Sequence, residues 1–227
     1  MKPGEVRHSL RSRWFKFIEF LGRAGIAVGG NPEQVFQALD RRYSEENRHY
    51  HNWTHVSACL DELEAARSFA IHPAAVEMAV WFHDAVYVPG APDNEELSAR
   101  IARSAAESMN LPSGTVRKVE TLILATRYLT DHDTPEALCP QDSALIRDVD
   151  LSILGKTRKE FDSYEEAIGL EYSSVPDRVR RQRRIHILEG FLALPEIYTV
   201  PPFQKRYEHQ ARQNLSRSIR RLRKLLA

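Results

Sequence analysis

The stretch PAAVEMAVWFHD, residues 73–84, decides the fold of this chain. Its proline stands at the first position of a helix, and apolar residues then recur at helical spacing until His83 continues their stripe. This spacing directs the imidazole of His83 and the neighbouring carboxylate of Asp84 toward the interior, where an unpaired charge would be costly. A core histidine with satisfied hydrogen bonds beside a capping aspartate would also explain the pair, so a metal site requires further partners.

The same helical spacing extends over almost the whole chain, and the alternation typical of a half-buried strand is missing. We expect roughly nine or ten helices and a polar loop at residues 131–141. The helices are expected around residues 14–21, at Asn31–Pro32, residues 52–55, Pro73, Asn94, Ser113, residues 143–154, a capping box of Thr157 and Glu160, residues 177–194 and residues 202–226. No internal repeat, low-complexity linker or domain boundary interrupts them. The pattern predicts one all-α domain, a compact multi-helix bundle.

The composition is typical of a soluble globular chain, with 227 residues, 42% hydrophobic and 28% charged, and a net charge of +1. Two cysteines, Cys59 and Cys139, are too few for a secreted disulfide framework. The first residues do not lead into the apolar region of a signal peptide, so we expect a cytoplasmic protein. Because no 18 apolar residues run together, we expect no transmembrane helix and no membrane partner.

The near-neutral total conceals an uneven distribution of charge. Residues 178–227 contain 13 basic and 3 acidic residues, a net charge of +10, and residues 1–177 carry −9. A solvated basic helix face explains this run. An anion-binding side of an otherwise acidic protein is the alternative. Nucleic acid is not an expected partner, because no binding motif or interleaving of basic and aromatic residues accompanies the charge.

A second histidine cluster lies in the stretch RHYHNWTH, residues 48–55. Its His51 and His55 have the spacing of zinc proteases, but Asn52 stands where those enzymes carry a glutamate base, which argues against that class. Because Asn52 is a good helix cap, we expect His51 before the helix and His55 in its first turn. Surface or structural roles remain open for His51.

A third polar element is RDVDLSILG, residues 147–155. Two aspartates among apolar residues of one helix cannot both point outward, because positions two apart differ by about 200°. Asp150 shares a stripe with Ile146 and Ile153, which makes it the better inward candidate. Asp148 lies near Leu145, so periodicity alone does not decide between the two.

These three elements together resemble the HD superfamily of metal-dependent phosphohydrolases, whose pattern is H…HD…D on an all-α fold. They are similar to a subgroup of predicted HD phosphohydrolases with the stretches YHNxxH, DNEExSA after the HD pair, and DxDLxILG. Here these stretches are residues 50–55, 93–99 and 148–155. The resemblance covers a core of about residues 31–222 and implies a single HD-type domain over residues 1–227.

The resemblance implies that His55, His83, Asp84 and Asp150 are metal ligands. Two imidazoles and two carboxylates give a net charge of zero around one divalent ion and leave about two of six octahedral positions open. Mixed nitrogen and oxygen donors with open positions suit Mn, Co, Ni, Fe or Mg better than a closed tetrahedral zinc site. We therefore expect one divalent metal ion, which would activate water and polarise a phosphoryl group.

Glu95, directly after the expected cap Asn94, is the expected general acid or base, with Asp84 as the other catalytic residue. An ordinary first-turn glutamate is the alternative interpretation of Glu95, and Glu96 is the second candidate for the general acid or base. Substrate is expected to be bound by Arg48, His51 and Arg184. Arg184 would clamp a phosphate bidentately, and a solvated surface position is the alternative for such an arginine.

One departure from the superfamily bears on the substrate. Members that hydrolyse the alarmone ppGpp have acidic residues where this chain has Tyr87 and Val88, which argues against that substrate. His132 has a shifted context and is assigned no role. The leading hypothesis is a phosphohydrolase that cleaves a phosphate ester of a small phosphorylated, possibly nucleotide, substrate. The alternative is a metal-stabilised nucleotide- or ligand-binding regulatory module with little turnover.

Overall fold

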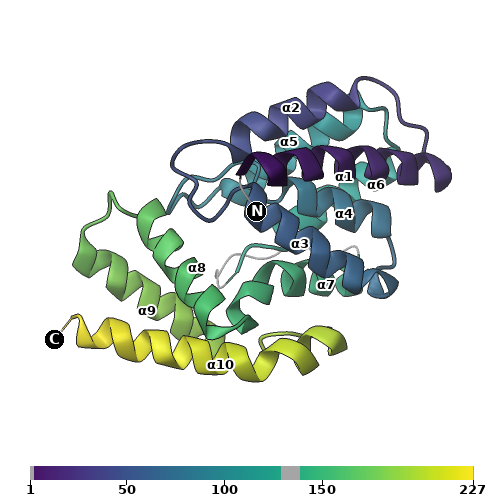
Figure 1. Cartoon of the computed structure of the whole chain (residues 1–227). Helices are drawn as coiled ribbons and strands as arrows, with labels where there is room; N and C mark the ends of the chain where they lie inside the picture. Colours follow the sequence, from purple (N-terminus) through teal and green to yellow (C-terminus); the bar gives the residue numbers. More distant parts are fainter. Residues whose placement is uncertain (1–2, 129–138, 227) are drawn as a thin grey trace.

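The computed structural model describes residues 3–128 and 139–226, which form ten α-helices, two short 3₁₀ helices and no strand (Figure 1). This architecture confirms the predicted all-α bundle. The helices are α1 (Pro3–Arg23), α2 (Pro32–Tyr43), α3 (Trp53–Ala65), η1 (Arg67–Phe69), α4 (Pro73–Phe82), α5 (Asn94–Ser108), α6 (Ser113–Leu124), α7 (Pro140–Asp150), η2 (Leu151–Gly155), α8 (Arg158–Glu171), α9 (Asp177–Ala193) and α10 (Pro201–Lys224).

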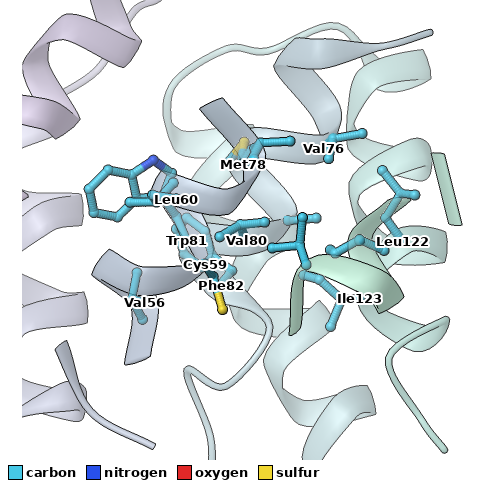
Figure 2. Close-up of a cluster of buried hydrophobic side chains, with 14 of the residues drawn as sticks. Val56, Cys59, Leu60, Val76, Met78, Val80, Trp81, Phe82, Leu122 and Ile123 are labelled. Carbon is cyan, nitrogen blue, oxygen red and sulfur yellow. The ribbon is translucent and has the colours of Figure 1, made fainter. Parts of the chain in front are cut away.

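Helix α4 is the centre of the core. Every residue from Ala75 to Phe82 is buried, because α3, α5, α6 and α7 all pack around it. Figure 2 shows its apolar side chains between Val56 and Leu60 of α3 and Leu122 and Ile123 of α6. Full burial of each large apolar side chain contributes about 1.5–3 kcal/mol relative to exposure. The helix that ends at the His-Asp pair is therefore held from all sides.

The N-terminal helix belongs to the same packed unit. Leu10, Trp14, Phe17 and Leu21 of α1 are almost completely buried, and α1 lies against α2 and α3. At the other end of the chain, α9 packs along α10, and α10 packs against η2 (Figure 1). None of the described helices is long and apolar enough to cross a membrane.

Three of the predicted helix starts have the expected capping bonds. The side chains of Asn31 and Asn52 accept backbone N–H bonds from the first turns of α2 and α3, and Thr157 and Glu160 form the capping box of α8. The cap predicted at Asn94 is wrong, because Asp93 precedes the helix and Asn94 is its first residue. The side chain of Asn94 instead bonds both backbone groups of Val88 at 2.9 Å and so closes the loop after the His-Asp pair.

The helix predicted at residues 143–154 differs from the observed one at both ends. Helix α7 begins at Pro140 and ends at Asp150, and the 3₁₀ helix η2 follows it. Helix α10 passes so close that a Cβ on Gly155 would lie 2.7 Å from the backbone oxygen of Tyr207. Residues 131–138 of the predicted loop, and with them His132, lie outside the described residues.

Candidate metal centre

Helices α3, α4 and α7 lie against one another (Figure 1). Each contributes to one cluster of polar side chains at its end. His55 is in the first turn of α3, as Asn52 predicts. The amide of Asn52 donates to the carbonyl oxygens of Arg48 and His49 at 3.1 Å, while its oxygen caps the helix. One side chain thus fixes both the helix start and the turn before it.

His83 and Asp84 follow the last residue of α4. Nδ1 of His83 lies 2.9 Å from the carbonyl oxygen of Val80. Because a carbonyl only accepts, Nδ1 carries the proton, and in the neutral imidazole Nε2 keeps a free lone pair. That lone pair is available to a metal ion, with the second ring nitrogen held by the backbone as is usual for a histidine ligand.

Arg48 holds the backbone of this turn. Its guanidinium donates to the carbonyl oxygens of Asp84 at 2.6 Å and Ala85 at 3.1 Å, and to the carbonyl of His51 at 3.1 Å. Glu45 pairs with its Nε, and the side chain is 1% exposed. The guanidinium predicted to bind substrate is therefore engaged in joining the turn before α3 to the turn after α4.

Asp150 is the last residue of α7. Its Oδ2 accepts a hydrogen bond from the hydroxyl of Tyr128 at 3.0 Å, which leaves Oδ1 facing the two imidazoles. Burial, followed by the charge of Asp150, raises the pKa of Tyr128, so this hydroxyl stays a donor at neutral pH. Tyr128 therefore orients the carboxylate of Asp150.

The four predicted ligand atoms converge. Nε2 of His55 is 3.0 Å from Nε2 of His83, and the carboxylate oxygens of Asp84 and Asp150 lie 3.1–3.5 Å from these nitrogens. With metal–donor distances of about 2.1 Å, neighbouring donors are about 3.0 Å apart in an octahedron and about 3.4 Å apart in a tetrahedron. The nitrogen–nitrogen and nitrogen–oxygen spacings match those of donors around one ion, and the donor types suit a divalent cation.

The open side of this cluster is its carboxylate side. The imidazole side chains are 2–3% exposed, whereas those of Asp84 and Asp150 are 19% and 18% exposed. Water or a ligand could therefore reach the cluster beside the two carboxylates, while the histidines close it from within.

The electrostatics also favour a cation in the middle. Burial lowers the pKa of both histidines, but the neighbouring groups outweigh it, and the pKa of His55 and of His83 lies well above the ordinary value. Burial raises the pKa of Asp84 and Asp150, yet the imidazoles hold each of these values below the ordinary one. The cluster thus attracts positive charge, which a proton or a metal ion can supply.

Cys59 is a residue that the sequence analysis did not assign to the site. Its sulfur lies 3.7 Å from both ring nitrogens of His55, and these two residues form a possible metal-binding group with His83 and Asp150. The equal distances place the sulfur off the lone-pair axis of either nitrogen, and Asp84 comes closer to both Nε2 atoms. The signal in the sequence for this contact was the spacing of four residues, which places Cys59 on the same helix face as His55.

His51 lies beside the cluster in a pair with Glu171. Its Nδ1 is 2.7 Å from one oxygen of Glu171, and the other oxygen accepts the backbone N–H groups of Tyr50 and His51. The ring stacks on Tyr87 at 3.7 Å between centroids. Glu171 comes 120 positions later in the chain, so no local pattern could have predicted this contact.

The two acidic candidates on α5 have different surroundings. Both carboxylates face Arg127. Glu96 forms the closer ion pair, which lowers its pKa although burial opposes it, and Oε2 of Glu95 lies 3.7 Å from Nε of Arg127. Glu95 is deeper, and burial raises its pKa, with Asp84 among the neighbouring charges. A carboxyl group with a raised pKa next to the donor cluster has the property that a general acid or base requires.

Arg184 and Asp148 have partners outside the cluster. Arg184 donates to Glu165 at 2.9 Å and to the hydroxyl of Tyr164 at 2.8 Å, so the predicted phosphate clamp is occupied by protein groups. Asp148 is buried and accepts the backbone N–H groups of Thr199 and Val200 at 2.9 and 2.6 Å. Of the two neighbouring aspartates, Asp150 faces the histidines and Asp148 holds the segment before α10.

A second group of possible metal ligands comprises His72, Cys139 and Asp142. The buried carboxylate of Asp142 already accepts the backbone N–H groups of Ile71 and His72 and contacts Nδ1 of His72 at 2.8 Å. Through these bonds Asp142 links the start of α7 to the start of α4, which explains why its carboxylate is buried.

A hollow of about 480 Å³ borders the cluster between α3, η2 and α8. His55 and Cys59 form part of its wall, and Lys156 and Lys159 lie on its rim. Lys156 is bound to Glu62 and Tyr207, whereas Lys159 is exposed. A small anionic ligand seated there would contact one of the histidines directly.

Comparison with known proteins gave no relative: no family model, no curated protein and no solved structure matches this chain.

Proposed function

We propose that this protein is a divalent-metal-dependent phosphohydrolase of the HD type. The observation that carries the proposal is the convergence of two histidine nitrogens and two aspartate oxygens at 3.0–3.5 Å. They belong to the residues that the H…HD…D pattern marks as ligands. An all-α bundle with this cluster is compatible with an HD-type domain, and no matched relative contributes to the proposal.

The residues present fit a divalent ion such as Mn, Co, Ni, Fe or Mg, held by His55, His83, Asp84 and Asp150. When bound, such an ion supplies Lewis acidity and lowers the pKa of coordinated water. The two imidazoles close the inner side of the site, and the partly exposed carboxylates leave room for a phosphate ester on the outer side.

Proton transfer is assigned to Glu95 in this proposal. Burial raises the pKa of its carboxyl group, so a proton is held more readily there than on an exposed glutamate. Glu96 forms the closer ion pair with Arg127 and its pKa is lowered, so it is less suited to this role than Glu95, whose contact with Arg127 is longer. The pair of His51 and Glu171 adds an imidazole of fixed orientation beside Asp84. Because its Nδ1 donates to Glu171, its Nε2 could accept a hydrogen bond from a substrate hydroxyl group.

The test is a screen for phosphate release from nucleotides, phosphosugars and an aryl phosphate, with Mn, Co, Ni, Fe and Mg in turn. The wild-type chain should release phosphate from at least one ester with at least one metal, and Asp84→Ala should abolish the release. Metal content measured on the same samples shows whether the variant has lost its ion. An activity that Asp84→Ala retains would contradict the proposal.

A metal-stabilised binding module is the second candidate, and one observation favours it. The guanidinium groups of Arg48 and Arg184, expected to hold a phosphate, are engaged by protein carbonyls and carboxylates. A chain that binds metal and a nucleotide but releases no phosphate from the whole panel would show this function instead.

A further inference from the structure

A separate cavity of about 700 Å³ lies between α8 and α9. Its volume is within the range of about 300–1,000 Å³ that small-molecule sites occupy. None of the four ligands of the candidate metal centre lines it. Tyr87 connects the cavity with the surroundings of the metal centre, because it lines the cavity and also stacks on His51.

Much of the cavity wall is apolar. Ile168 and Tyr172 of the α8 side, Ile187 of α9 and Leu222 of α10 line it. Ile187 is 39% exposed and therefore unusually open for its type. Two further large apolar side chains on these helices, Leu170 and Val179, are also exposed. A concave apolar wall that remains open to solvent is typical of a ligand site.

Two arginines that line the same cavity, Arg183 and Arg221, are exposed and have no hydrogen bond or ion pair with the described residues. The three other arginines of the wall are paired, Arg180 and Arg181 with Asp177 and Arg184 with Glu165. The sequence places this wall in the segment that carries a net charge of +10. Two unpaired arginines on this wall give the cavity positive charge beside an apolar surface.

We propose that this cavity binds an organic phosphate monoester whose remaining body is apolar or aromatic. A phosphate dianion matches two guanidinium groups, which bind its oxygens through charge-assisted hydrogen bonds. The apolar wall would take up the body of the ligand. The proposal does not rest on the function of the metal centre, because its residues form a different site.

Binding is measured by isothermal titration calorimetry with three probes: adenosine monophosphate, hexyl phosphate and inorganic phosphate. The titrations are run on the wild-type chain and on Asp84→Ala, which separates binding here from binding and turnover at the metal centre. One of the two organic phosphates should bind in both proteins, and inorganic phosphate should bind at least about tenfold more weakly because it has no body to bury. The organic probe that binds more tightly shows whether the cavity prefers a ligand with an aromatic or an aliphatic body.

Two kinds of variant test the location. Arg183→Ala combined with Arg221→Ala should weaken binding at least about tenfold, because a hydrogen bond to a charged group contributes about ten- to hundredfold to affinity. Gly169→Leu leaves the arginines in place but fills the cavity, and a Cβ at Gly169 meets nothing within 4 Å, so the fold should persist. This variant should weaken binding to a similar degree.

Arg178→Ala combined with Arg220→Ala is the matched control, because these exposed arginines are on the same two helices outside the cavity wall. It removes the same charge and should change the affinity less than about twofold. Three results would overturn the proposal: no binding of either organic phosphate at millimolar concentration, equal affinity for inorganic phosphate, or a control that weakens binding as much as the cavity variant.

Discussion

Asp148 and Asp150 are two positions apart in one helix, and the same substitution at each should have opposite consequences. Oδ1 of Asp150 lies 3.1 Å from His55 and 3.5 Å from His83, whereas Oδ2 of Asp148 accepts the N–H groups of Thr199 and Val200. Asp150→Asn should therefore lose metal with little change of fold. Asp148→Asn should keep its metal and most of its stability.

The magnitude for Asp148→Asn follows from its two hydrogen bonds. A bond to a charged group contributes about 1.5–3 kcal/mol and a neutral one about 0.5–1.5 kcal/mol, so neutralising the acceptor of two bonds costs about 2–3 kcal/mol. Burial nevertheless raises the pKa of Asp148 to about 6, so the desolvation of the ionised group, which an amide avoids, offsets these bonds. The net change in the free energy of unfolding should therefore stay within about 1 kcal/mol.

The magnitude for Asp150→Asn concerns metal affinity. Loss of a residue that only orients a ligand weakens metal binding about 10- to 100-fold, so loss of the charge of a ligand itself should weaken it at least about 100-fold. Metal per chain is measured by mass spectrometry after dialysis, and stability by urea unfolding of metal-free protein. Metal lost from Asp148→Asn and kept by Asp150→Asn would refute this interpretation.

Three further predictions concern other parts of the structure. Glu95→Gln should keep its metal and lower turnover on any identified ester at least about a hundredfold, while Glu96→Gln keeps turnover; equal rates in steady-state kinetics would remove Glu95 from the mechanism. Because hydrogen bonds lower the folded-state pKa of Glu171 below 4.5, its contribution to stability is fully present above that pH and is lost as the pH falls through the folded value, so the difference in urea midpoint between wild type and Glu171→Gln should shrink on acidification. Gly155→Ala should lower the free energy of unfolding by about 1–3 kcal/mol because its Cβ would meet the backbone of α10, whereas Gly169→Ala should raise it by about 0.5–1 kcal/mol; a similar loss in both would contradict the packing argument.

The parts of the fold that the sequence predicts are those set by local patterns. Helical periodicity gives the all-α class, and the short-range bonds of Asn31, Asn52 and Thr157 mark helix starts correctly. Asn94 shows the limit of this reasoning, since its amide bonds Val88 across a loop instead of capping the helix. Gly155 shows another limit, since the 3₁₀ turn that ends there depends on the approach of α10.

For the site, spacing along the chain places residues on helix ends but does not identify their partners. The choice between Asp148 and Asp150 stayed open in the sequence because each lies near apolar residues of its helix. In the structure Asp148 is buried and Asp150 is partly exposed, and the two have different partners. Arg48 and Arg184 look alike as basic residues near a site. Their engagement by backbone carbonyls and by Glu165 depends on contacts between distant segments, which no local pattern contains.

The arrangement of the candidate centre implies that its geometry does not depend on an ion. Each ligand-bearing helix end is held by a contact outside the cluster: Asn52 before α3, Arg48 after α4, and Tyr128 at the end of α7. Because these contacts bind backbone groups or the outer carboxylate oxygen, they persist when the inner atoms of the cluster are unbound. A preorganised set of donors selects among ions by size and charge instead of folding around any one of them. The metal preference of the proposed centre should therefore follow the donor spacing, with the sulfur of Cys59, among the described residues, near enough to shift it.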